Sequence, residues 1–157
     1  MTKALVVYDS ATGNTEKMAK AIGDGLWEAG LIVAIQKVDN TTLDDLASAE
    51  AIVLGSPTYF CTMSGKMKAL IDKSIKIYEP GRKLQDKIGA AFTSSDEVAG
   101  GNETTLLSLI QAMLMHKMVI VGHQSGSFGA VSVGTPDKNC ITQCQLFGKR
   151  IASFVKR

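Results

Sequence analysis

The sequence has only three cysteines and no apolar stretch long enough to span a membrane. Cys61, Cys140 and Cys144 cannot all pair within one chain and match no zinc-binding spacing, which excludes a disulfide scaffold and favours a reducing compartment. A membrane helix needs about 20 apolar residues, whereas the N-terminal apolar run stops before Asp9 and is too short for a signal peptide. We therefore expect a cytoplasmic protein with no membrane insertion and no metal site.

The charge balance is nearly even, with 17 Lys and Arg against 15 Asp and Glu, a formal net charge of +2. Such a balance creates no broad positive field, so nucleic acid is not an expected partner. We see no internal repeat, low-complexity tract or linker. At 157 residues and 45% hydrophobic content, residues 1–157 are predicted to form a single domain.

Five short apolar runs predict strands at residues 4–8, 31–35, 51–55, 88–92 and 118–122. Their apolar character is continuous rather than alternating, which is typical of parallel strands covered on both faces. Helical spacing of apolar residues follows each run, at residues 18–29, 43–46, 67–75, 106–114 and 141–155. The order βαβαβαβαβα predicts an α/β fold with a doubly wound parallel sheet.

Ligands of such sheets bind beyond the carboxyl ends of the strands, so the segment after the first strand is a candidate site. A helix that begins near Asn14 presents free N–H groups and a partial positive charge, which can hold a phosphate without lysine or arginine. Hydroxyl groups add donors, and Gly13 permits an unusual backbone conformation. A polar turn with an ordinary helix cap is the alternative. The candidate residues are Ser10, Ala11, Thr12, Gly13, Asn14 and Thr15.

Other phosphate-binding classes fit this segment poorly. It contains neither G-x-x-x-x-G-K-[ST], which binds nucleoside triphosphates, nor the dinucleotide motif G-x-G-x-x-G. A response-regulator receiver domain would carry an aspartate at the end of the third strand, where this chain has Ser56.

The segments after the third and fourth strands are also unusual. Pro57 stiffens the first of them, and Tyr59 and Phe60 offer aromatic faces to a flat heterocycle. In the second, Gly100 and Gly101 allow close backbone approach before Asn102 or Thr104 caps the next helix. Each segment alone could be a packed or flexible loop. Together with the phosphate segment they predict a mononucleotide with a tricyclic ring, FMN; the hydroxyl residues that follow the fourth strand are Thr93, Ser94 and Ser95.

The motif SATGNT at residues 10–15 resembles the phosphate-binding signature of the flavodoxin family, and the resemblance covers essentially the whole chain. The segments GSPTYFCTMSGKMKALID and FTSSDEVAGGNETTLLSLIQAMLMHKMVIVG resemble more closely the flavodoxin-like NAD(P)H:quinone oxidoreductases once named for tryptophan-repressor binding. The resemblance implies a three-layer α/β/α sandwich with a five-stranded parallel sheet in the order 2-1-3-4-5. It also implies FMN as the cofactor.

The same resemblance assigns roles to residues of the loops. It places the isoalloxazine loop on Thr58, Tyr59, Phe60 and Cys61, and the third loop on Ser94, Ser95 and the stretch to Gly100. The histidine that closes over the flavin in the quinone reductases matches His116, although a polar residue at a helix end is the alternative. A looser match puts Tyr78 near the substrate side of the ring.

Two departures from the family affect which of its properties we expect in this chain. The chain is compact between the second and third strands and before the last helix, where the quinone reductases carry segments that build their tetramer and nicotinamide site. Cys61 stands where the family has glycine, and a side chain disfavours positive φ by ~1 kcal/mol. Cys61 could also be a redox thiol, whereas Cys140 and Cys144, one helical turn apart, are expected to pack in the core.

Three functions follow. The first is an FMN protein that carries electrons between redox partner proteins, with no catalytic side chain, because the flavin supplies the chemistry. The alternative is an FMN-dependent NAD(P)H:quinone oxidoreductase, which would need a nicotinamide pocket near His116 and residues 125–131. A flavin-free interaction module is the third. Each of the three functions is compatible with a homo-oligomer.

Overall fold

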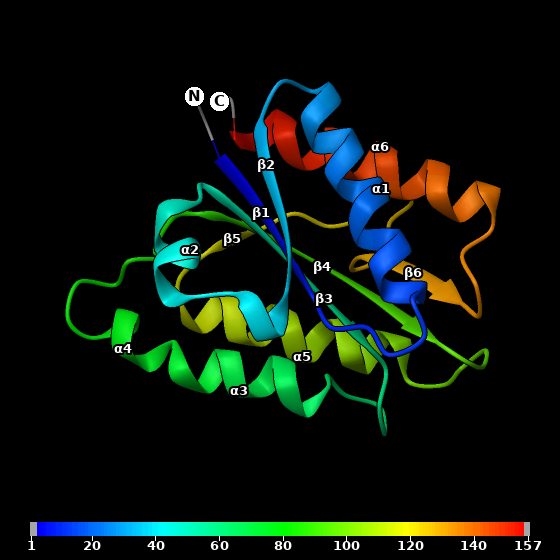
Figure 1. The fold of residues 1–157 in the computed structure, drawn as a ribbon, viewed down its shortest axis with the longest axis horizontal. Helices are drawn as coiled ribbons and strands as arrows, with labels where there is room; N and C mark the ends of the chain where they lie inside the picture. The colour runs from blue at the N-terminus through cyan, green and yellow to red at the C-terminus, as the bar shows by residue number, and fades with distance from the viewer. Residues whose placement is uncertain (1–2, 156–157) are drawn as a thin grey trace.

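The computed structural model describes residues 3–155, in which a parallel sheet lies between two layers of helices (Figure 1). The strands follow the order β2-β1-β3-β4-β5, and β6 also pairs with β4. All of these pairings are parallel. The predicted order 2-1-3-4-5 is therefore confirmed. The strands are β1 (Lys3–Tyr8), β2 (Ile32–Lys37), β3 (Ala51–Pro57), β4 (Ile88–Ser95), β5 (Val119–Ile120) and β6 (Ala130–Val133).

The helices form the two outer layers. In Figure 1, α1 and α6 lie together on one face of the sheet, and α2, α3, α4 and α5 cover the other. This arrangement confirms the three-layer sandwich. Among the helices described between residues 3 and 155, none has the length and apolar character needed to cross a membrane. Their bounds are α1 (Asn14–Glu28), α2 (Leu43–Ser48), α3 (Gly65–Lys73), α4 (Ile75–Tyr78), α5 (Asn102–Met115) and α6 (Lys138–Val155), with a short 3-10 turn, η1, at Val38–Asn40.

The central strands are buried on both faces, as their continuous apolar runs predict. In β1, Val6 belongs to the core cluster under α1 and α6, whereas its neighbours Leu5 and Val7 belong to the cluster under the other helices. The prediction is wrong for β2, where Ile32 and Ile35 are exposed. Among the strands described, β2 pairs only with β1 and forms the edge of the sheet, so part of its surface faces solvent.

The fifth strand is split. The run at 118–122 pairs with β4 only through Val119 and Ile120, against Ile88 and Gly89. The chain then leaves the sheet and returns as β6, which pairs with the last four residues of β4. At the return point a Cβ on Gly129 would lie 2.1 Å from the Ala91 carbonyl oxygen, so the close approach to β4 requires glycine. The sequence prediction missed β6.

The helices begin in two different ways. Thr42 and Ser64 cap α2 and α3 with their side chains. By contrast, α1 and α5 begin after Gly13 and Gly101, whose φ angles are 96° and 101°, and no described side chain caps either helix. The expected cap at Asn102 or Thr104 is therefore wrong. Both uncapped helix starts follow strands of the sheet directly, at its carboxyl edge.

Candidate functional site

The segment between β1 and α1 forms a cup of hydroxyl and amide groups. The Gly13 amide donates a hydrogen bond to Ser10 Oγ at 3.1 Å, which closes the turn. Thr12 is exposed, and the first-turn N–H groups of α1 have no side-chain cap among residues 3–155. Unpaired amides at the positive end of a helix bind anions. This donor set suits a phosphate group.

The one acidic residue in the first turn of α1 is Glu16. It forms an ion pair with Lys20 at 3.0 Å, and this hydrogen bond and charge lower the pKa of the Glu16 carboxyl. Its charge is therefore partly balanced by a lysine one helical turn along the helix.

A buried hydrogen bond joins the cup to the end of β4. Thr15 Oγ1 and Ser94 Oγ lie 2.8 Å apart, and both side chains are buried. The neighbouring segment is tied to β4 in the same way, because Thr58 Oγ1 lies 2.8 Å from Thr93 Oγ1 and the Thr58 amide donates to the Ser94 carbonyl at 2.8 Å. All three segments that follow β1, β3 and β4 thus meet at one edge of the sheet.

The segment after β3 ends in a tight hairpin. The backbone groups of Tyr59 and Thr62 exchange two hydrogen bonds, of 3.0 and 3.1 Å. The two residues between them, Phe60 and Cys61, have φ angles of 49° and 64°, the signs required by a type I′ turn. Cys61 therefore adopts positive φ despite its side chain, at a cost of ~1 kcal/mol. The Phe60 side chain is fully exposed.

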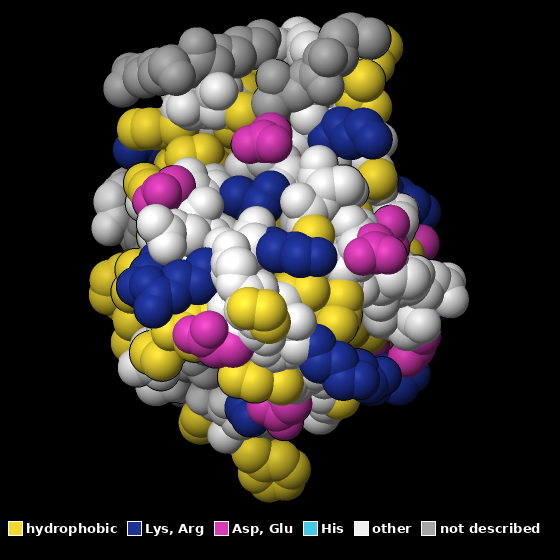
Figure 2. Space-filling view, turned by 90° about the vertical axis from the view of Figure 1, so that its left-hand side faces the viewer, with side chains coloured by type: hydrophobic (Ala, Val, Ile, Leu, Met, Phe, Trp, Pro, Cys, Tyr) yellow, Lys and Arg dark blue, Asp and Glu magenta, His cyan; other side chains and the backbone are white. Residues whose placement is uncertain are grey.

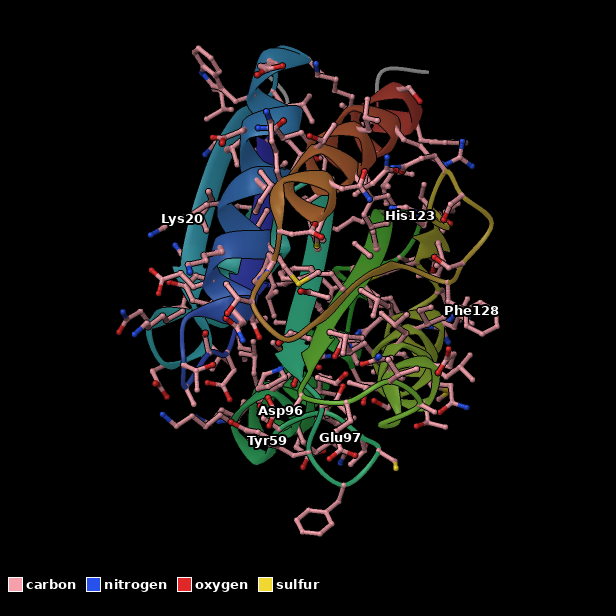
Figure 3. All side chains as sticks on the ribbon, turned by 90° about the vertical axis from the view of Figure 1, so that its right-hand side faces the viewer. Lys20, Tyr59, Asp96, Glu97, His123 and Phe128 are labelled. Carbon is pink, nitrogen blue, oxygen red and sulfur yellow. The ribbon has the colours of Figure 1, made fainter. Side chains whose placement is uncertain are left out.

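The segment after β4 packs directly against this hairpin. A Cβ on Gly101 would lie 2.6 Å from the Cα of Cys61, so only glycine permits this contact. Figure 3 shows Tyr59, Asp96 and Glu97 together at this end of the molecule. The Gly100 amide donates to the Glu97 carbonyl at 3.1 Å. An aromatic side chain, a hairpin backbone and a glycine-rich loop therefore adjoin the phosphate cup.

The structure brings together the predicted cofactor-binding residues of all three loops. It does not bring the remaining predicted cofactor-binding residue, His116, to the same place. His116 follows the last residue of α5, a helix of 14 residues whose first residue adjoins the loops. At 1.5 Å per residue its two ends are about 20 Å apart. The structure therefore does not place His116 beside the loops of its own chain, and its assignment to the flavin stays a prediction. The residues brought together are Ser10, Ala11, Thr12, Gly13, Asn14, Thr15, Pro57, Thr58, Tyr59, Phe60, Cys61, Thr93, Ser94, Ser95, Gly100 and Gly101.

His116 instead lies beside Ser74 and Tyr78. Its Nε2 is 2.7 Å from Ser74 Oγ, and its ring meets the Tyr78 ring edge-on at 5.5 Å. Burial lowers the pKa of His116. Together with Ile75 and Met115, these residues line a cavity of about 430 Å³ between α3, α4 and α5. His116, which the resemblance assigned to the flavin, and Tyr78, which it assigned to the substrate side of the ring, are therefore neighbours.

A second cavity, of about 360 Å³, lies beside α6 and was missed by the sequence prediction. Cys140 and Cys144 line it together with His123 and several hydroxyl side chains. Core packing is confirmed for Cys144, which is fully buried, whereas Cys140 is half-buried and packs against the margin of the same core cluster. The spacing of four residues in a helix was the available signal, because it places both thiols on one face.

The surface carries charges of both signs. On the face shown in Figure 2, Lys and Arg side chains alternate with Asp and Glu, and neither sign gathers into a patch. This agrees with the even charge balance of the sequence.

The parallel sheet and the three polar loops at its carboxyl edge define a protein of the flavodoxin-like class. Residues 36–131 match the family described as NADPH-dependent FMN reductase, and the chain belongs to this family. It is 34% identical to an NAD(P)H dehydrogenase (quinone) of Archaeoglobus fulgidus, over 100% of this chain and 99% of the relative. It is also 32% identical to a flavodoxin of Clostridium saccharobutylicum, over 99% and 98% of the two chains.

Solved structures show the same relationship. The flavodoxin, WrbA-like protein from Agrobacterium tumefaciens superposes with a TM-score of 0.87 at 26% identity and covers 99% of this chain and 98% of its own. A flavodoxin from the domain Archaea has a TM-score of 0.83 at 30% identity, with 99% and 100% of the chains covered. The predicted membership of the flavodoxin-like proteins is confirmed.

Proposed function

We propose that this chain binds FMN noncovalently and carries electrons between redox partner proteins. The observation that carries the proposal is the buried Thr15–Ser94 hydrogen bond, which joins an uncapped helix start to the loops that follow β3 and β4. A phosphate site, an aromatic side chain and an exposed backbone hairpin thereby lie side by side. A phosphorylated flat heterocycle requires such a combination.

The residues present fit FMN. The phosphate would be held by the hydroxyls of Ser10, Thr12 and Thr15 and by the first amides of α1. Gly13 leaves open space beside these groups, because a Cβ added there would meet no atom within 4 Å. Residues 58–61 of the segment after β3 and the loop of residues 93–101 would hold the ring. Both loops offer backbone amides and hydroxyls, which orient a ligand through hydrogen bonds.

Bound FMN would supply the one- and two-electron chemistry. The protein would bind the cofactor, tune its potential through Tyr59 and the carboxylates of Asp96 and Glu97, and leave one edge open to partners. The exposed Phe60 and Val98 side chains stand beside these groups in the loops. An exposed rim of this kind suits brief contact with another protein.

The lengths of the alignments favour the carrier. The alignment with the Archaeoglobus relative extends over 190 positions, so that relative has segments absent from this chain of 157 residues. The alignment with the Clostridium flavodoxin extends over only 162 positions. The chain thus has the compact length of a flavodoxin.

An FMN-dependent NAD(P)H:quinone oxidoreductase is the second candidate. Several relatives named NAD(P)H dehydrogenase (quinone) are 34–37% identical to this chain. The net charge of +2 also differs from a strongly acidic docking surface. In this case the partners would be NAD(P)H and a quinone instead of proteins.

Anaerobic mixing of the FMN-loaded protein with NADH or NADPH separates the two functions. A carrier leaves the flavin absorbance unchanged on the timescale of turnover and takes up electrons only from a reduced partner protein. Rapid bleaching by a nicotinamide, with turnover when a quinone is added, would establish the enzyme. A purified protein that remains colourless after incubation with FMN would refute both.

The remaining expectations are part of the same proposal. We propose that residues 1–157 act as one domain in the cytoplasm, without nucleic-acid or membrane partners. Size-exclusion chromatography with light scattering would decide between a monomer and the homo-oligomer left open by the resemblance.

A further inference from the structure

The cavity beside α6 contains a pair of thiols in a polar setting. Its walls come from the first two turns of α6, from β6 and from the loop between β5 and β6, and its volume is about 360 Å³. Exposed residues such as Ser125, Thr135 and Asn139 stand at its margin, so the cavity opens to solvent. Figure 3 places His123 on the side of the molecule near α6, away from Tyr59, Asp96 and Glu97. None of the residues that line the cavity belongs to the three loops, although β6, which forms one wall, pairs with Ser94 and Ser95 of β4.

Cys140 is the more accessible of the two thiols. It is half-buried in the first turn of α6, where its amide donates to Asp137 Oδ1 at 2.7 Å. As a thiol it donates a weak hydrogen bond to the Val131 carbonyl, with a sulfur–oxygen distance of 3.7 Å. Cys144, one turn further along the helix, is fully buried and hydrogen bonds to Cys140.

This hydrogen bond favours ionisation of Cys140. The Cys144 thiol, acting as donor to the Cys140 sulfur, and to a smaller extent the Ser132 side chain lower the pKa of Cys140 to about 7, against the opposing effects of burial and of the Asp137 carboxylate. The same contact and burial raise the pKa of Cys144, which therefore keeps its proton. The titratable side chains that line the cavity are His123, Asp137, Cys140 and Cys144. A thiolate in a pocket open to solvent is a nucleophile.

We propose that Cys140 is a reactive thiol at which a small disulfide, bound in the cavity beside α6, forms a mixed disulfide with the protein. The Cys140 thiolate attacks one sulfur of the disulfide. A new sulfur–sulfur bond forms as the original one breaks, and the other half leaves as a thiolate that takes a proton from solvent. Cys140 is oxidised and the leaving thiol is reduced, so no further oxidant is required.

The chemistry of the cavity favours a small polar disulfide. Its volume is at the lower end of small-molecule pockets, about 300–1,000 Å³. Hydroxyl and amide side chains such as Ser127, Thr135 and Gln143 can hydrogen bond to peptide-like groups. Among residues 3–155, no group of three or more His, Cys, Asp or Glu side chains is placed to hold a metal ion, so thiolate exchange is favoured over metal binding.

The mixed disulfide should persist. Cys144 could resolve it only by forming a bond with Cys140 along an intact helix, for which the geometry is poor. The product would therefore be one adduct per chain at Cys140, removed only by an added thiol.

The test uses oxidised glutathione as the probe and the Cys61→Ser variant as the protein, because Cys61 is exposed and would otherwise react as well. Peptide mass spectrometry should find a single glutathionyl group on Cys140. The rate should reach half its maximum near pH 7, and it should saturate as the probe concentration rises, because binding precedes exchange.

Two further variants separate reactivity from packing. Cys144→Ala removes the hydrogen-bond donor, and Cys144→Ser retains one. Loss of the donor should move the midpoint of the rate profile toward the ~8.5 of a free cysteine. At pH 7 the exchange should slow by only about 3-fold, because a more basic thiolate is also more nucleophilic. The Cys144→Ser variant should react at nearly the parent rate.

Absence of the adduct at Cys140 in the folded protein, while the urea-unfolded chain is modified, would overturn the proposal. A rate that rises linearly with oxidised glutathione, with a midpoint near ~8.5 that Cys144→Ala leaves unchanged, would also overturn it. None of these readouts requires bound FMN, so they are independent of the proposed function.

Discussion

Thr15 Oγ1 and Ser94 Oγ lie 2.8 Å apart inside the protein, although 79 positions separate them in the sequence. The contact fixes the first turn of α1 relative to the end of β4. Because Thr58 is held by Thr93 and by the Ser94 carbonyl, the hairpin after β3 is positioned by the same two β4 residues. One short stretch of β4 therefore sets the relative placement of all three loops.

Replacement of Thr15 by valine tests this contact. The variant keeps the shape of the side chain but removes its hydroxyl, so the proposed phosphate loses a donor and Ser94 loses its partner. A hydrogen bond to a charged group contributes about 1.5–3 kcal/mol, so FMN affinity should fall by about tenfold or more. Quenching of FMN fluorescence measures the dissociation constant.

Thr142→Val is the matched control for this test. Thr142 is exposed on α6 and donates only to the Lys138 carbonyl, at 3.0 Å. Its replacement should leave FMN affinity unchanged. Equal dissociation constants for Thr15→Val and the parent protein would contradict a role for Thr15 in the cup.

Replacement of Gly101 by alanine tests the contact between the second and third loops. The added methyl group would lie 2.6 Å from the Cα of Cys61, and the residue would have to keep a φ of 101°. Both effects push the hairpin away, so FMN should bind more weakly and the near-ultraviolet circular dichroism of Tyr59 should change. Gly65→Ala is the control, because its Cβ would meet no atom within 4 Å. Unchanged FMN affinity in Gly101→Ala would show that FMN binding does not depend on the position of the hairpin.

The fold was predictable wherever a buried strand alternates with an amphipathic helix. The runs that become β1, β3 and β4 are continuous and apolar, and Met18, Ile22 and Leu26 repeat at helical spacing along α1. The sequence did not reveal β6, because its four residues include Ser132 and follow a glycine-rich loop. Its pairing depends on the close approach at Gly129, which is a tertiary contact.

The meeting of the three loops was predictable from the sequence, but the position of His116 and the cavity beside α6 were not. Polar residues that directly follow parallel strands must meet at one edge of the sheet, which is why the three loops come together. This argument does not apply to His116, which was assigned from the resemblance and follows the C-terminal end of α5, a helix length from that edge. Cys140 and Cys144 were interpreted as core because a helical spacing shows a shared face but not the cavity beside it.

The close contact between α1 and α6 gives a prediction for stability. A Cβ on Gly148 would lie 2.2 Å from the Ile22 carbonyl oxygen and 2.9 Å from the Leu26 amide nitrogen. Gly148→Ala should therefore force the helices apart and lower the free energy of unfolding by about 1–3 kcal/mol, the usual cost of overpacking. Urea unfolding followed by circular dichroism measures it. Ser153→Ala, on the exposed side of α6, should change stability much less; an equal loss in both variants would contradict the packing account.

His116 gives a prediction for pH dependence. Burial lowers its pKa below the unfolded value, so the folded state binds the proton less readily than the unfolded chain. Its neutral form therefore supports stability above about pH 6.5, and that support is lost as the pH falls through the lowered pKa. His116→Gln should unfold at a temperature that depends less on pH between about 7.5 and 5. His123, whose pKa is lowered by burial and by the Arg150 charge, should retain its own part of the dependence. Identical pH profiles for the variant and the parent would exclude this role.

The central claim is that hydroxyl and amide groups at the start of α1 hold a phosphate, and the FMN affinity of Thr12→Glu tests it most directly. Thr12 is exposed in the cup, so a glutamate there should fold normally while it places a negative charge beside the phosphate. Two like charges about 4 Å apart near a protein surface repel by about 4 kcal/mol, so we expect affinity to fall by at least about tenfold. Thr12→Gln, equal in size but neutral, should bind FMN much more tightly than Thr12→Glu. If fluorescence titration gives the same dissociation constant for the Glu variant, the Gln variant and the parent protein, the phosphate is not held in this cup.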